Sequence, residues 1–92
     1  MTTSPPSTKE KLEIIELVVR YAALIDGQTY DALGDVFTAD ALIDYRSVGG
    51  LYARWPEVLA WLPSAMSRFE VTQHFVSNVR FEPDGDDIRV RA

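Results

Sequence analysis

The sequence contains no cysteine and a single histidine, His74. Without thiols the chain has no disulfide, no thiolate nucleophile and no cysteine-ligated metal site. One histidine is too few for a zinc triad. Six aspartates have spacings typical of caps, turns and solvated surface, not of a metal cluster: Asp35, Asp40, Asp44, Asp84, Asp86 and Asp87. We therefore expect no metal, no cofactor and a fold held together by packing.

Several other features are missing. There is no glycine-rich phosphate loop, since Gly49–Gly50 marks an ordinary loop, and no serine lies in a nucleophile-elbow context. Nine basic residues against fourteen acidic ones are scattered along the chain, which disfavours nucleic acid. No apolar run approaches the ~18–20 residues needed to span a bilayer, and residues 1–7 lack a signal core. We expect a cytoplasmic protein that binds neither nucleic acid nor membrane.

What the chain does have is apolar surface. Of its 92 residues 47% are hydrophobic and 11% are aromatic, which is typical of one globular domain. A domain of this size buries only roughly 60–65% of the surface of its unfolded chain, so a partner subunit would add stability. A homodimer is the expected assembly.

The first half predicts a helical hairpin. Residues 1–7 form a polar, proline-bearing lead that we expect to be disordered, and the domain follows over 8–92. Ser7 and Glu10 have the spacing of a capping box, which predicts a helix over 8–25 with a Glu16–Arg20 pair on its wet face. Gly27 stops this helix, and Thr29 can cap a shorter one over 30–37.

The second half predicts strands around one more helix. A strand is expected at 41–46 and a helix at 55–65, where Pro63 is a possible early stop. Strict alternation over 70–81 predicts a long strand with Val71, Phe75, Val79 and Phe81 on one face and with His74 and Asn78 on the other. A turn at 83–85 leads into a return strand over 88–92.

This order of elements resembles the start of the SnoaL-like branch of the nuclear-transport-factor-2-like superfamily. Four stretches carry the resemblance: Leu17–Asp26, Tyr30–Ala41 with its Phe-Thr-Ala-Asp-Ala step, Ile43–Arg46 and Thr72–Asn78. The resemblance implies an α+β cone, in which a curved and mainly antiparallel sheet wraps around the helices and leaves a deep apolar pocket. The branch includes small dehydratases, similar to scytalone and bile acid dehydratases, as well as isomerases and cyclases.

In the dehydratases that this sequence resembles, the tyrosine and aspartate of the first helix and the strand histidine line the pocket. By position these are Tyr21, Asp26 and His74. Imidazole can remove a proton next to a carbonyl, a carboxylate can fix its tautomer, and a phenol can stabilise the developing oxyanion. Each also has an ordinary alternative: a solvated strand histidine, a turn aspartate beside Gly27 and a core tyrosine.

Three further residues are candidates for the substrate pocket, each with a structural alternative. Tyr45 lies on the first expected strand, and Asn78 lies on the same face as His74; packing and a structural hydrogen bond are their alternatives. Trp61 can wall the pocket, but it and Trp55 can equally cover the core.

The resemblance also implies that further strands follow the position of Ala92, so the domain over 8–92 is expected to be incomplete. Our first hypothesis is a cofactor-independent dehydratase or isomerase of a small, cyclic, apolar carbonyl compound, such as a steroid or polyketide. The second is a non-catalytic small-molecule-binding or dimerisation module, in which the face of Val71, Phe75, Val79 and Phe81 packs on a second subunit. The third is an incomplete domain with an exposed sheet edge.

Overall fold

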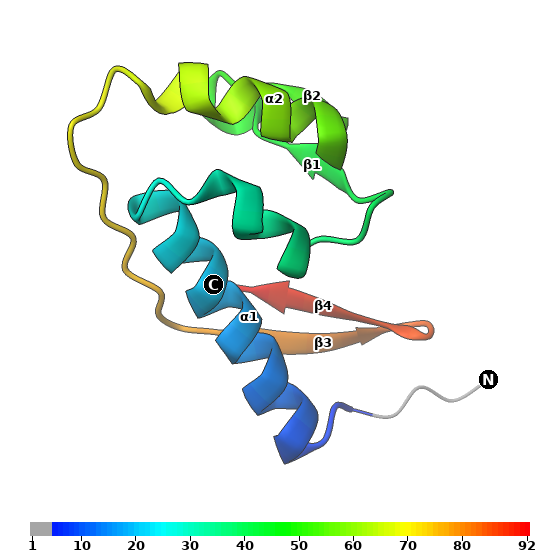
Figure 1. Cartoon of the computed structure of the whole chain (residues 1–92). Coiled ribbons are helices and arrows are strands. Elements are labelled where there is room, and N and C mark those ends of the chain that lie inside the picture. The colour runs from blue at the N-terminus through cyan, green and yellow to red at the C-terminus, as the bar shows by residue number, and fades with distance from the viewer. Residues whose placement is uncertain (1–4) are drawn as a thin grey trace.

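The computed structural model describes residues 5–92; of the predicted lead over 1–7, residues 1–4 lie outside the described part (Figure 1). The first helix, α1, spans Thr8–Asp26. The capping box predicted from Ser7 and Glu10 is present, because each side chain accepts a hydrogen bond from the other residue's backbone N–H. The helix ends at Gly27, as predicted, and the Gly27 N–H donates to the Ala23 carbonyl at 2.9 Å.

The helix expected over 30–37 is shorter and more tightly wound, a 3₁₀ helix, η1, over Tyr30–Asp35. Thr29 precedes it without forming a side-chain cap. Arg20 of α1 binds Asp35 of η1 at 2.9 Å, in place of the predicted Glu16–Arg20 pair along the helix. This ion pair joins the two arms of the helical hairpin, which a pairing inside α1 would not do.

Two short strands and a helix form the next unit. Strand β1 (Leu42–Asp44) pairs antiparallel with β2 (Tyr52–Arg54), and the loop between them contains a 3₁₀ turn, η2 (Arg46–Val48). Helix α2 follows directly over Trp55–Met66. Pro63 does not end α2, which continues for three residues beyond it. The strand β2 was not predicted, because three residues are too few to show a period of two.

The long strand predicted over 70–81 is wrong for residues 70–79, which form an irregular segment. Strand β3 begins only at Arg80 and runs to Asp84, pairing with β4 (Asp87–Arg91) across a tight turn. Alternation indicates a strand only where a neighbouring strand supplies hydrogen bonds, and within the described residues 70–79 have no such neighbour. The backbone of Asn78 has a positive φ of 55°, which lies outside the range of a β-strand.

The expected α+β class is confirmed, and within residues 5–92 the pairing is divided between two two-stranded antiparallel sheets, β1–β2 and β3–β4. In Figure 1, α2 covers β1–β2, α1 crosses the middle, and the segment 69–79 runs past the end of α1 to the β3–β4 hairpin. Among residues 5–92, none of the helices combines the length and the hydropathy that a membrane span requires. The core lies between η1, β1, β2, α2 and the last turn of α1: Ile25, Leu33, Ile43, Ala53, Trp55, Val58 and Leu62.

Candidate functional site

The carboxylate of Asp26, at the last position of α1, holds the segment that contains His74. Its Oδ1 accepts hydrogen bonds from the Thr72 hydroxyl at 2.8 Å and lies 2.7 Å from His74 Nδ1. Its Oδ2 accepts the backbone N–H of His74 at 2.6 Å. Three hydrogen bonds to one carboxylate therefore fix both the backbone and the ring of His74, although no strand within residues 5–92 pairs with this segment.

These contacts also determine protonation. Partial burial raises the pKa of Asp26, but the hydrogen bonds from the His74 backbone, the Thr72 hydroxyl and the His74 ring together lower it below its ordinary value. Asp26 is thus ionised near neutral pH and can only accept hydrogen bonds. His74 Nδ1 must carry the shared proton, which leaves the lone pair of the neutral ring on Nε2.

A pair of phenols lies next to the imidazole. The Tyr21 and Tyr45 hydroxyl oxygens are 2.5 Å apart, and the Tyr21 ring packs edge-on against the His74 ring at a centroid distance of 6.1 Å. Burial, followed by the hydrogen bond to Tyr21, raises the pKa of Tyr45. Tyr45 therefore stays protonated. One phenol O–H forms the hydrogen bond between the two oxygens, so the other phenol O–H is left to donate to a ligand.

These groups border a cavity of about 260 Å³ between α1, the β1–β2 loop and the end of α2. Four of the predicted residues line it, namely Tyr21, Tyr45, Trp61 and His74. Asp26 lies behind His74 and does not line the cavity, and neither does Asn78, which follows the irregular segment. The rest of the lining is mostly apolar: Ile25, Val48, Gly49, Gly50, Leu62, Ala65, Met66, Arg68 and Phe69.

Of the two roles considered for the tryptophans, packing in the core and forming a pocket wall, each tryptophan has one. Trp55 is 6% exposed and belongs to the core, whereas Trp61 stacks on Tyr45 at a centroid distance of 5.8 Å and walls the cavity. Gly50 makes this wall possible. A Cβ at Gly50 would lie 2.7 Å from the Tyr45 Cβ and 2.9 Å from the Trp61 ring, so only glycine fits under the stacked pair.

Sequence reasoning missed Thr72, Arg68 and Phe69. Thr72 lies two residues before His74, a spacing that signals a shared partner only once the partner is known. Arg68 and Phe69 follow the end of α2, where no periodicity singles them out. The contact between Tyr45 and Tyr21 was also not predicted, because the two residues belong to different elements and no sequence spacing relates them.

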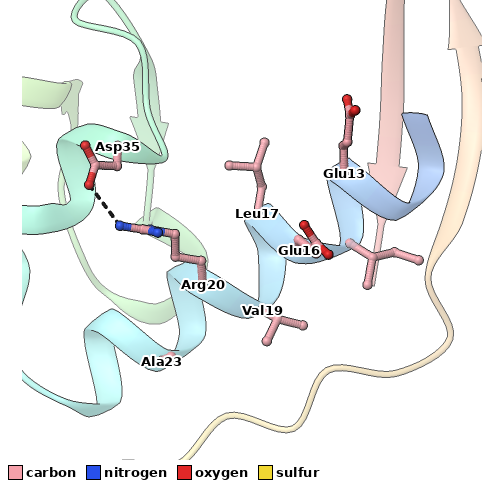
Figure 2. Close-up of a pocket in the computed structure, with 8 residues that line it drawn as sticks. Glu13, Glu16, Leu17, Val19, Arg20, Ala23 and Asp35 are labelled. Carbon is pink, nitrogen blue, oxygen red and sulfur yellow. Dashed lines mark hydrogen bonds and ion pairs between the residues drawn. The ribbon is translucent and has the colours of Figure 1, made fainter. Parts of the chain in front are cut away.

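A second hollow, of about 580 Å³, lies on the outer side of α1 (Figure 2). Figure 2 shows Arg20 directed at Asp35 on one side of it, with Leu17 and Val19 along the helix. Its ionic groups are open to solvent, with side-chain exposures of 52% for Arg20 and 67% for Asp35. This groove contains neither His74 nor the phenol pair, so it offers no comparable chemistry.

Comparison with known proteins agrees with the geometry. A sequence profile of the SnoaL-like domain matches residues 6–92. The chain belongs to the SnoaL-like domain family. The predicted resemblance is therefore confirmed, and in this SnoaL-like domain Tyr21 and His74 line one cavity while Asp26 binds His74 from behind.

Three curated mycobacterial proteins that this SnoaL-like domain matches are themselves uncharacterised. It is 42% identical over 77 residues to uncharacterised proteins of Mycobacterium tuberculosis (strain H37Rv) and Mycobacterium bovis, an alignment that covers 84% of this chain and 52% of each relative. The chain thus spans about half the length of the curated relatives it matches. No solved structure matches it.

The hydrogen bonds to Asp26 predict a pH-dependent contribution to stability. Because folding lowers the pKa of Asp26, its charge stabilises the fold fully above the ordinary value of 3.8, and this stabilisation is lost as pH falls through the folded-state pKa. We expect Asp26→Asn to lower the free energy of unfolding near neutral pH and to matter progressively less below about pH 4. Urea unfolding of both proteins from pH 7 to pH 3 measures this. A difference at pH 3 as large as that at pH 4 would contradict it.

The close approach at Gly50 gives a second prediction. Gly50→Ala forces Tyr45 and Trp61 apart, which should cost about 1–3 kcal/mol and change the near-UV circular dichroism of the stacked rings. Gly34→Ala is the matched control, since nothing lies within 4 Å of a Cβ there. An equal, small effect of the two substitutions would show that the stacking does not depend on Gly50.

Proposed function

We propose that this SnoaL-like domain belongs to a cofactor-independent dehydratase or isomerase that abstracts a proton next to a carbonyl. The observation that supports this most is the His74 ring, held through Nδ1 by Asp26 and placed edge-on against Tyr21 at the wall of a mostly apolar cavity. The chain spans only about half the length of the relatives it matches. The activity of a whole protein that contains this domain is therefore also a proposal.

His74 is the proposed base. Its Nε2 takes a proton from the carbon next to the substrate carbonyl, and the electron pair of the broken C–H bond forms an enolate double bond. The imidazolium that results is stabilised by the carboxylate of Asp26, 2.7 Å from Nδ1. Asp26 acts only through His74, because it does not line the cavity.

The phenol pair is the proposed electrophile. As the proton leaves, negative charge builds up on the carbonyl oxygen, and an O–H donor strengthens its hydrogen bond as that charge grows. Tyr21 lies closest to the imidazole ring and donates to this oxygen, while Tyr45 supplies the hydrogen bond that orients Tyr21. Either phenol oxygen can hold the shared proton.

The enolate then has two outcomes. In a dehydration, the electron pair returns, a carbon–carbon double bond forms beside the restored carbonyl, and the β-hydroxyl leaves as water with the proton held by His74. In an isomerisation, that proton returns to the γ-carbon of an unsaturated substrate. Both outcomes conserve protons and electrons, so neither needs a further reactant.

The cavity supports a small, cyclic, apolar substrate. Its volume of about 260 Å³ falls just below the ~300–1,000 Å³ common for drug-sized ligands, which favours one or two fused rings over a four-ring steroid. Trp61 and Phe69 offer flat aromatic walls for such rings. We also propose that the protein acts in the cytoplasm.

The mechanism can be tested without knowing the substrate, by following exchange of the α-protons of 1-tetralone with deuterium oxide by NMR. We expect the domain, or its full-length form, to accelerate exchange. His74→Ala, Asp26→Asn and Tyr21→Phe should each reduce the rate by about 10²–10⁴-fold, the usual contribution of a positioned acid or base.

Matched controls are available for two of these variants. Asp86→Asn removes a carboxylate in the β3–β4 turn, and Tyr52→Phe removes an exposed phenol that packs on Arg46. Both should exchange at the unmodified rate. Full exchange in the His74→Ala protein would eliminate the mechanism.

A second candidate is a non-catalytic ligand-binding or dimerisation module. The observation that favours it is the exposure of Val71 and Phe75, at 83% and 84%, in the segment that also contributes His74 to the cavity wall. Exposed apolar side chains next to a ligand site are typical of an interface. In this function a second copy of the chain covers the segment, and ligand is bound without being converted.

The dimerisation function predicts concentration-dependent self-association. Replacing Val71 and Phe75 together by serine should shift the protein to monomer, measured by light scattering after size exclusion, because each loses the apolar area that a partner would bury. Leu12→Ser is the control, since Leu12 is 57% exposed on the first turns of α1, away from the segment. A monomer at every concentration before substitution would rule the dimer out.

A further inference from the structure

The cavity carries one cation whose charge is not neutralised by the protein. Of the seven arginines, five bind acidic side chains or a carbonyl: Arg20, Arg46, Arg54, Arg89 and Arg91. Within residues 5–92, Arg68 and Arg80 form no ion pair, and only Arg68 lines the cavity. Its guanidinium is therefore available to a ligand.

Arg68 is exposed, so it stands at the opening of the cavity, and it is positioned by a neighbour. Its guanidinium lies over the ring of Phe69, 5.0 Å from the ring centroid, and Phe69 also lines the cavity. A guanidinium that rests on an aromatic face keeps its N–H edge free, and that edge matches the two oxygens of a carboxylate.

The charges around the cavity favour an anion at Arg68. The chain carries a formal net charge of -5, which repels anions at long range. Among the described residues no aspartate or glutamate lines this cavity, and Asp26 is occupied behind His74 by three hydrogen bonds. Arg68 thus faces an apolar cavity with no competing carboxylate in its wall.

We propose that Arg68 determines specificity by binding a carboxylate on the ligand, so that the molecule bound in this cavity is a cyclic acid and not a neutral ring compound. The inference rests on the proposed function, because it concerns the same cavity. The rings pack against Trp61 and Phe69, while the carboxylate stays at the opening and keeps part of its hydration. The reacting carbonyl remains with the phenol pair.

The test compares two probes of nearly equal shape, 2-naphthoate and its neutral amide, by calorimetric titration at low salt. Because the contact is close to solvent, we expect naphthoate to bind about 3- to 10-fold more tightly than the amide. Arg68→Gln should bring the ratio of dissociation constants to about one, and Arg68→Lys should retain part of the preference. Arg80→Gln removes the same charge away from the cavity and should leave the ratio unchanged.

Three outcomes would overturn the inference: equal affinity for the two probes, a preference that survives Arg68→Gln, or no binding of either probe. The exchange of 1-tetralone by the unmodified protein separates this inference from the proposed function. Exchange without a preference for naphthoate would refute the role of Arg68 alone. A preference for naphthoate without exchange would refute the catalytic proposal and leave Arg68 as the anion site of a binding module.

Discussion

The site depends on one carboxylate. Asp26 ends α1, and its two oxygens accept hydrogen bonds from the Thr72 hydroxyl, the His74 backbone and the His74 ring. The segment 70–79 has no strand partner among the described residues, so these bonds replace the sheet ladder that would otherwise fix its position. A single charged group thereby orders a backbone segment, selects a histidine tautomer and closes one side of a cavity.

The phenols of Tyr21 and Tyr45 lie next to the imidazole that Asp26 holds. Tyr21 belongs to the same helix as Asp26, about 1.4 turns earlier, while Tyr45 comes from the loop after β1. Stacking of Tyr45 on Trp61 connects the phenols to α2, and the absence of a side chain at Gly50 allows that contact. Helix α1 therefore carries both the carboxylate that holds His74 and the phenol beside His74, which fixes their relative positions.

The cavity combines polar and apolar groups. Its polar groups, His74 and the two phenols, meet apolar side chains of α2 such as Leu62 and Met66, and under the proposed function the apolar side chains would hold the rings of a ligand while the polar groups orient its oxygen. The same segment that supplies His74 also exposes Phe75 to solvent. Ligand binding and any association through this segment would consequently influence each other, because both depend on the bonds to Asp26.

The sequence by itself determined the local features: the capping box at Ser7, the extent of α1, the helix after Trp55, the turn before β4 and, through family resemblance, the α+β class. These depend on neighbours in the chain or on a shared motif. The resemblance also named Tyr21, Asp26 and His74 as candidates, whose role in catalysis stays a prediction. Only the tertiary structure decided what long-range contacts control: the irregular path of 70–79, the pairing of Arg20 with Asp35, and the meeting of Tyr21 with Tyr45. Alternation at 70–81 predicted a strand because it reports side-chain polarity, whereas a strand also needs a partner, which no local pattern encodes.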